Sequence, residues 1–387
     1  MKNYIQHIRS GFIITGILFA LFLYFNKDQP LNELLMASVC FVLLHLLLFT
    51  LGNQGVAAQL TTDLKAGTEK TLLFPNCLIA LLYIYIIYHG GSPLEGSAAL
   101  FPFFALFPVL GFLAFKKTYI VWSDFVFLLL LLIPSVSISF KSNTSLPVHG
   151  NGFSSVYKLV IMLLAFYAFG IVRGIKDIGF YPVFQWRALG ISLACWLVFL
   201  GLVWLIAYAS GFLNLSGAEA FAEEGFAQGL RNMIRVFLGT ALFEELFFRG
   251  LIQNMLAKKI GQYKNWRPFW QWSLVLFAAL AFLTGYLMDK SLFWLPLLIT
   301  GLLFAAAYLI EKSGKTSQGT YTALAITSIF FGLVHFHAGS IIFVGLASIA
   351  GWFYGYTYLK TRNVFYAALV HTLVNSSEFL FALDGLR

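Results

Sequence analysis

The residues best suited to chemistry lie in one short stretch, Ala241 to Gly250, which reads Ala-Leu-Phe-Glu-Glu-Leu-Phe-Phe-Arg-Gly. Two adjacent carboxylates and an arginine interrupt an otherwise apolar run. A charged group near the centre of a bilayer costs about 2.5–3.5 kcal/mol on insertion scales, so these groups must pair with one another or serve a site. At about 100° per residue, Glu245 and Arg249 share a helix face and are expected to form an ion pair, whereas Glu244 points elsewhere. We therefore interpret Glu245 and Arg249 as supporting residues and Glu244 as a candidate catalytic residue.

Two further apolar segments carry polar groups. His335 follows Phe331 by four residues, and the last apolar segment places His371 and Asn375 four residues apart on one stripe. Hydrolysis of a peptide bond in an apolar site needs a base that deprotonates water and donors that hold the oxyanion. His335 could share the water with Glu244, and His371 with Asn375 could donate hydrogen bonds to the oxyanion.

The same side chains allow a second use, as ligands of a metal ion. Glu244, His335 and His371 would supply three ligands and a water would take the fourth position, which is the arrangement of catalytic zinc sites. The sequence leaves open whether one zinc ion is bound or a metal-free glutamate mechanism operates.

The elements that must position these residues are membrane-spanning helices. The chain has 387 residues, of which 60% are hydrophobic and only 11% are charged, and the apolar residues come in blocks of about 18–22. This composition predicts an all-α, polytopic integral membrane protein with about 13 transmembrane helices. The predicted spans are Gly11–Phe25, Leu31–Leu51, Thr71–Tyr88, Ala98–Phe115, Ile120–Phe140, Val156–Val172, Ala188–Ala209, Ile234–Leu256, Phe269–Leu287, Phe293–Ile310, Ala323–Phe336, Ile341–Tyr358 and Val364–Leu383.

The charges between these spans predict an orientation. Most of the 25 Lys and Arg residues fall in alternate connecting segments. The positive-inside rule then places the N-terminus in the cytoplasm and the C-terminus outside. Because the basic excess is explained as loop charge, no nucleic-acid partner is expected. The expected partners are the lipid bilayer and a membrane-associated protein or peptide substrate, and the expected location is a bacterial inner (plasma) membrane.

The polar groups at membrane depth are concentrated in the final third of the chain, which predicts two parts. Residues 1–180 form an N-terminal multi-spanning region of unknown role, and residues 181–387 form the catalytic domain, with motifs at 244–249, 331–335 and 371–375. Within the second part, two spans without a buried ionisable group form an inserted helical hairpin, 269–310. The segment Ser216–Arg231 is expected to be an interfacial helix on the membrane surface or, alternatively, a gate over the site.

The three motifs together resemble those of the CAAX protease and bacteriocin-processing family of intramembrane proteases, also called the Abi family. Glu244-Glu245 with Arg249 looks like the first motif of that family, Phe331 with His335 like the second, and His371 with Asn375 like the third. The resemblance extends from about Ile234 to the C-terminus. It implies an intramembrane endopeptidase in which Glu244 and His335 activate water and His371 with Asn375 stabilise the oxyanion.

Two other functions remain open from the sequence. Buried Glu and His also build proton relays, so a proton-coupled transporter is one alternative, although the first half of the chain does not mirror the polar residues as inverted repeats would. A non-catalytic membrane scaffold or immunity factor is the other.

Overall fold

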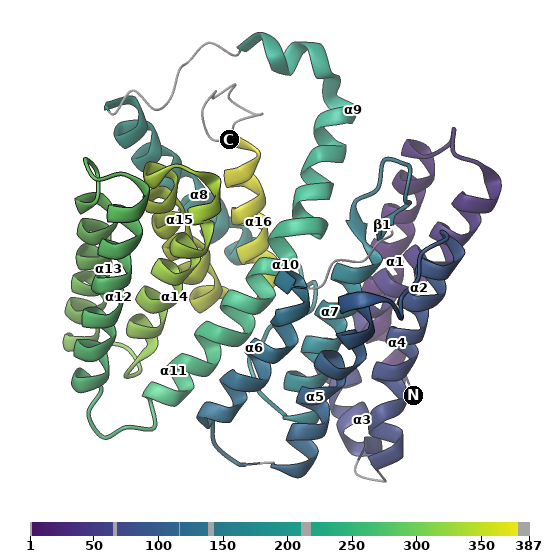
Figure 1. The fold of residues 1–387 in the computed structure, drawn as a ribbon, viewed down its shortest axis with the longest axis horizontal. Helices are drawn as coiled ribbons and strands as arrows, with labels where there is room; N and C mark the ends of the chain where they lie inside the picture. Colours follow the sequence, from purple (N-terminus) through teal and green to yellow (C-terminus); the bar gives the residue numbers. More distant parts are fainter. Residues whose placement is uncertain (1, 65–67, 116, 138–142, 210–217, 378–387) are drawn as a thin grey trace. The chain divides into compact units, whose positions relative to one another are not determined.

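The computed structural model covers residues 1–387 and describes all of them except 1, 65–67, 116, 138–142, 210–217 and 378–387. Within the described residues the chain is almost entirely helical, with a single two-stranded sheet in which Ser145 pairs with Ser155 and Leu146 with Ser154. The predicted all-α class is therefore confirmed (Figure 1).

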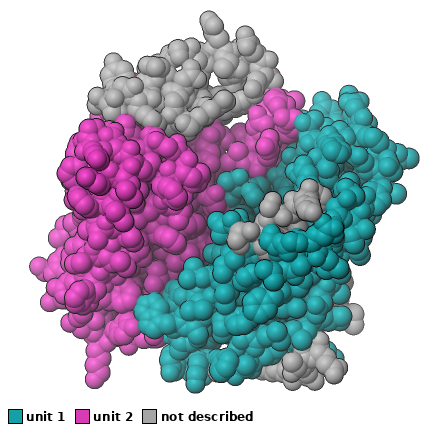
Figure 2. All heavy atoms as spheres, in the orientation of Figure 1, with its two compact units in different colours: residues 1–183, 238–243 teal, residues 184–237, 244–387 magenta. Residues whose placement is uncertain are grey.

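The chain divides into two compact units, shown in teal and magenta in Figure 2. Unit 1 comprises Met1–Val183 and Leu238–Phe243, and unit 2 comprises Phe184–Phe237 and Glu244–Arg387. The elements along Met1–Val183 are α1 (Lys2–Phe25), α2 (Leu31–Thr50), α3 (Gln54–Leu64), α4 (Thr68–Tyr88), η1 (Gly96–Leu100), α5 (Phe101–Ala114), α6 (Trp122–Ser137), β1 (Ser145–Leu146), β2 (Ser154–Ser155), α7 (Val156–Phe166) and the π-helical η2 (Tyr167–Val172).

The core of unit 1 is built around α7. From Leu159 to Phe166 this helix is apolar on all sides, as expected of a helix that is buried all round, and α7 packs against α2, α4 and α6. At the end of η2 the buried Arg173 closes the unit with a bidentate ion pair to Asp124 of α6, at 2.9 and 3.0 Å. Because Arg173 also donates to the carbonyl oxygens of Lys117 and Tyr119, each nitrogen of its guanidinium and both Asp124 oxygens have a hydrogen-bond partner although the two side chains are buried.

The remaining elements follow in the second part of the chain. They are α8 (Trp186–Ala209), α9 (Ala218–Val236), η3 (Phe237–Ala241), α10 (Leu242–Glu245), η4 (Leu246–Gln253), α11 (Asn254–Ile260), α12 (Arg267–Met288), α13 (Trp294–Lys312), α14 (Thr320–Val334), η5 (His335–Ala338), α15 (Ile341–Thr361) and α16 (Val364–Asn375). The core of unit 2 is formed by α14, α15 and α16, with α8 packed on α15 and α16 and the α12–α13 pair packed on α14.

The segment predicted to be an interfacial helix or a gate is helical from Ala218 onward. Its predicted cap, Ser216, lies outside the described residues. The helix is broken at Gly225, whose φ of 73° and ψ of 156° are not helical, and α9 contacts α16.

The α12–α13 hairpin occupies the predicted segment, and its two predicted spans carry no buried ionisable side chain. One residue beyond the predicted end of the second span, α13 carries the buried Glu311. The Glu311 carboxylate accepts the backbone N–H groups of Gly319, Tyr321 and Thr322 at 3.2, 2.7 and 2.7 Å. The first N–H groups of a helix have no partner within the helix, so this carboxylate from the preceding helix caps α14.

Within the described residues, nine helices are long and apolar enough to span a membrane, and three shorter apolar helices are Trp122–Val136, Val156–Val172 and Val364–Asn375. These twelve correspond to twelve of the predicted spans. The thirteenth, Ile234–Leu256, is not one uniform α-helix, because α9, η3, α10, η4 and α11 divide it. This divided helix carries the glutamate pair.

Candidate active site

The helix that carries Glu244 and Glu245 has wide turns on both sides of the pair. The segment α10, Leu242–Glu245, lies between two π-helical segments, Phe237–Ala241 before it and Leu246–Gln253 after it. A π-helix bonds residue i to i+5 instead of i+4, and such turns inside α-helices are found frequently at functional sites. The pair therefore lies on a helix whose local geometry departs from a regular α-helix.

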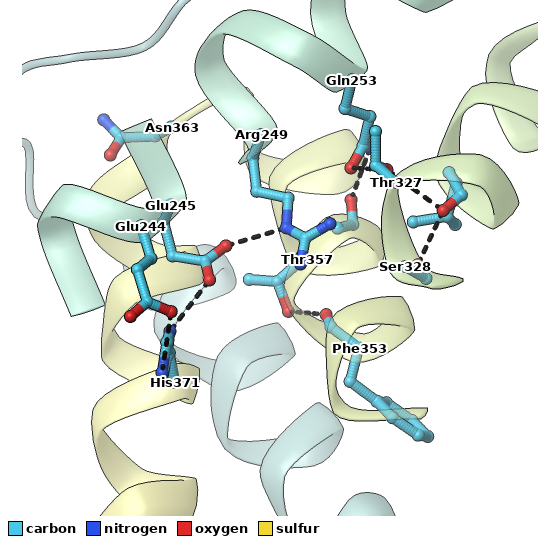
Figure 3. Close-up of polar contacts among 12 residues, drawn as sticks. Glu244, Glu245, Arg249, Gln253, Thr327, Ser328, Phe353, Thr357, Asn363 and His371 are labelled. Carbon is cyan, nitrogen blue, oxygen red and sulfur yellow. Dashed lines mark hydrogen bonds and ion pairs between the residues drawn. The ribbon is translucent and has the colours of Figure 1, made fainter. Parts of the chain in front are cut away.

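The predicted ion pair within this helix is confirmed. Arg249 Nε lies 2.9 Å from Glu245 Oε2, and both side chains are fully buried (Figure 3). The guanidinium carbon also lies 5.3 Å from the ring centroid of Phe331 and 5.8 Å from that of Phe248, within the range of cation–π attraction. The terminal Nη1 and Nη2 groups have no hydrogen-bond partner within the described residues.

The buried polar stripe continues one step beyond the predicted residues, to Gln253. Its Nε2 donates to the carbonyl oxygen of Gly355 at 3.1 Å, and its Oε1 accepts from Thr327 Oγ1 at 3.4 Å. A Cβ atom on Gly355 would lie 2.5 Å from Gln253 Oε1, so α15 needs a glycine here to admit the glutamine. The signal was present in the sequence, because Gln253 continues the four-residue spacing of Glu245 and Arg249.

His371, on α16, contacts both glutamates. Its Nδ1 lies 2.9 Å from Glu245 Oε1, and its Nε2 lies 4.0 Å from Glu244 Oε2. The imidazole stacks on Tyr354 of α15, with ring centroids 4.6 Å apart and an interplanar angle of 9°, and Phe331 meets it edge-on at 5.7 Å. These two aromatic rings fix the plane of the imidazole. Tyr354 is a site residue that the sequence analysis did not identify.

His335 approaches Glu244 from the end of α14. It is the first residue of η5, and its Nδ1 lies 2.6 Å from the carbonyl oxygen of Phe331. Its Nε2 lies 4.0 Å from Glu244 Oε2, the same distance as from His371 Nε2 to that oxygen. The structure therefore brings three predicted site residues, from three helices, to one point.

Asn375, the fourth predicted catalytic residue, does not contact the group formed by Glu244, His335 and His371. It is the last residue of α16, one turn beyond His371, and it is exposed. Its side chain has no hydrogen bond to another described residue.

The hydrogen bonds of the two histidines define which nitrogen atoms face Glu244. A carbonyl oxygen and an ionised carboxylate can only accept hydrogen bonds, so both Nδ1 atoms must be the donors. In the neutral imidazole the Nε2 atom then carries a lone pair. Glu244 Oε2 is itself buried and has no hydrogen-bond partner within the described residues. Three hydrogen-bond acceptors, Glu244 Oε2 and the Nε2 atoms of His335 and His371, therefore lie close together.

This geometry also tests the predicted zinc ligands. Two ligands of a tetrahedral zinc ion at about 2.0–2.1 Å from the metal lie about 3.3 Å apart. The 4.0 Å distances from Glu244 Oε2 to His335 and His371 are wider. No group of three or more His, Cys, Asp and Glu side chains in the described ranges is arranged to hold a metal ion. As placed, the three residues do not form a zinc site, although their donor atoms are of the type that zinc binds.

The fold and this site together define a polytopic α-helical membrane protein in which a glutamate pair, an arginine and two histidines lie together. Comparison with known protein families finds a match to the C-terminal part of the chain. Residues 226–317 and 312–377 match the family described as type II CAAX prenyl endopeptidase Rce1-like. The match confirms, for the C-terminal region, the family resemblance that the three motifs predict, and it supports a CAAX-type intramembrane protease in general terms.

Comparisons with curated proteins and with solved structures gave no match.

Proposed function

We propose that this protein is an intramembrane endopeptidase that hydrolyses a peptide bond of a membrane-associated protein or peptide, with Glu244 as the general base. One observation carries the proposal. The buried, unpartnered Oε2 of Glu244 lies 4.0 Å from the Nε2 atoms of both His335 and His371. A separation of 4.0 Å is too long for a direct hydrogen bond, but a water molecule between the groups can bond to each at a normal distance.

Glu244 and His335 activate this water. The carboxylate accepts one water proton, and the Nε2 lone pair of His335 accepts a hydrogen bond from the other O–H group, which orients the oxygen toward the substrate. As the Glu244 oxygen accepts the proton, the water oxygen forms a bond to the scissile carbonyl carbon. The carbonyl oxygen becomes an oxyanion.

His371 and Asn375 provide the donors for that oxyanion. Because His371 Nδ1 already donates to Glu245, its Nε2 can donate only when the ring is the doubly protonated imidazolium. The Glu245 carboxylate lies beside this positive charge and balances it, so Glu245 has a role in the reaction beyond its ion pair with Arg249. The side-chain amide of Asn375, on the same stripe of α16, is the second donor.

Collapse of the tetrahedral intermediate breaks the C–N bond. The proton held by Glu244 passes to the leaving nitrogen, so that the products are a carboxyl terminus and an amine, and Glu244 returns to its ionised form. The name of the matched family refers to CAAX prenyl endopeptidases. For this chain we propose the wider substrate class of membrane-associated proteins and peptides.

The experiment that tests this function compares the terminal peptides of the membrane proteome in cells carrying the wild type, Glu244→Gln or Glu95→Gln. Glu95 is exposed and lies in unit 1 between α4 and η1, so it receives the same chemical change away from the site. We expect new termini in cells carrying the wild type and Glu95→Gln and none in cells carrying Glu244→Gln, with all three proteins equally abundant. Termini that persist with Glu244→Gln would show that Glu244 is not the base.

A further inference from the structure

The turn of helix directly before Glu244 belongs to unit 1. Residues Leu238–Phe243 cluster with Met1–Val183, whereas the chain from Glu244 onward clusters with unit 2. This short segment includes most of the π-helical η3 and the first two residues of α10. The boundary between the units therefore falls inside α10, at the candidate base.

The charged side chain of Lys158, in unit 1, contacts this turn. Lys158 Nζ donates a hydrogen bond of 2.6 Å to the carbonyl oxygen of Gly239, and it lies 5.8 Å from the centroid of the Phe243 ring. The base of the lysine is fixed, because it lies in the first turn of α7 and its backbone N–H is capped by Ser155 Oγ at 3.1 Å. A lysine at the end of a spanning helix more often extends toward the aqueous interface. Here it turns to a backbone carbonyl group.

Gly239 brings the turn close enough for this contact. A Cβ atom at this position would lie 2.9 Å from the carbonyl oxygen of Phe153, which directly precedes β2. Only a residue without a side chain allows the two backbones to approach this closely. Lys158 and the backbone at Phe153 thus contact the same residue of η3.

The residue that Lys158 contacts lies close to Glu244 along one helical segment. Gly239 belongs to the π-helical η3, and Glu244 follows it by five residues in α10, which begins directly after η3. A displacement of the η3 turn therefore changes where the Glu244 side chain begins.

We propose that Lys158 is a positioning residue for Glu244: it holds the η3 turn in the geometry that directs the base toward the histidines. This inference rests on the proposed function for its effect on catalysis. It also gives the N-terminal region a role, since that region supplies the residue that orients the catalytic helix. A displacement of about 1 Å at a catalytic group can reduce the rate by about 100-fold, so a small shift of this turn is sufficient.

The test compares Lys158→Met with two partners, Lys158→Arg and Lys70→Met. Methionine keeps the length and apolar stem of lysine but removes the donor, whereas arginine restores a cationic donor. Lys70 is exposed and lies in the same unit, so Lys70→Met removes a charge without touching η3. We expect Lys158→Met to lower kcat by about 10-fold to 100-fold with KM within about twofold of wild type. Lys158→Arg and Lys70→Met should stay within about threefold of wild type in kcat.

A second measurement does not depend on a substrate. Hydrogen exchange of the backbone amides in residues 237–245 should be faster in Lys158→Met than in wild type, Lys158→Arg or Lys70→Met, with exchange in the rest of unit 1 unchanged. Wild-type exchange and wild-type kcat in Lys158→Met would overturn the proposal, and so would faster exchange throughout unit 1, which would indicate a general structural role. If Glu244→Gln itself leaves cleavage intact, the proposed function fails, and the exchange measurement still decides whether Lys158 holds this turn.

Discussion

At the scale of single residues, Glu245 makes more contacts than its helix spacing predicts. Its pairing with Arg249 follows from a separation of four residues and is confirmed. Its hydrogen bond to His371 crosses from one helix to another, and the two residues are 126 positions apart in the sequence. Spacing along one helix cannot reveal such a contact. The sequence therefore predicted the pairing of Glu245 with Arg249, but not that one imidazole lies between the two glutamates.

The buried pair of Glu245 and Arg249 leads to a prediction about stability. Both side chains are fully buried, so Arg249→Met leaves a carboxylate without its main counter-charge. We expect this variant to lower the free energy of unfolding by about 3–5 kcal/mol, which is the usual cost of breaking a buried pair. The double variant Glu245→Gln with Arg249→Met should lose less than the single variant, because the uncompensated charge is gone.

Reversible unfolding in detergent micelles, followed for the wild type, the two single variants and the double variant, measures this coupling. Additive losses in the cycle would mean that the two charges do not stabilise one another. The same four proteins should differ in activity as well, since every change at Glu245 also removes the charge beside His371.

At the scale of the helices, the position of His335 depends on how closely α14 approaches α15. Gly332 lies one turn before His335, and a Cβ atom there would lie 2.6 Å from the carbonyl oxygen of Val344 and closer still to Ser348 Oγ. Gly332→Ala must therefore push the two helices apart. Overpacking of this kind costs about 1–3 kcal/mol.

We expect Gly332→Ala to reduce peptide cleavage by at least about tenfold while the protein remains folded, because His335 moves away from Glu244. Gly301→Ala is the matched control, since Gly301 is an exposed helical glycine of α13 with no atom within 4 Å of an added Cβ. It should leave cleavage unchanged and stability equal or slightly higher. Thermal unfolding and cleavage rates of the two variants check this prediction, and equal effects would argue against a requirement for close helix packing at Gly332.

The helices also show where sequence patterns were insufficient. The ends of the apolar blocks predicted most helices to within a few residues, as at Leu31–Thr50 and Val156–Val172. Glu311 was missed because it lies at the very end of such a block, where a charged residue usually faces water. Its partners are the backbone N–H groups that begin α14, and no residue pattern marks a cap donated by the preceding helix.

At the scale of the whole molecule, the described residues form the polytopic helical protein that the composition predicts. Composition predicted this because 60% of the residues are hydrophobic and lie in long blocks, and a helix satisfies the backbone hydrogen bonds of such a block within the block itself. The orientation, with the N-terminus inside and the C-terminus outside, stays a prediction from the distribution of Lys and Arg.

Labelling with a membrane-impermeant thiol reagent can test this orientation. Cys77 is exposed whereas Cys40 and Cys195 are buried, so Cys77→Ser provides a suitable background. Lys264→Cys and Lys290→Cys then place one exposed thiol before α12 and one after it. In intact cells we expect labelling of Lys290→Cys and not of Lys264→Cys, which should react only after the membrane is permeabilised. The opposite pattern would reverse the predicted orientation.

The π-helical turns around the glutamate pair have a consequence for how this protein is compared and engineered. Each wide turn holds one residue more than an α-helical turn, and one residue corresponds to a rotation of about 100° around the axis. Residues on either side of Phe237–Gln253 are therefore out of phase with one another relative to a regular helix. A helical wheel drawn through the whole segment assigns some side chains to the wrong face. A deletion that made the helix regular would keep every candidate site residue in the chain and still rotate Glu244 away from the histidines.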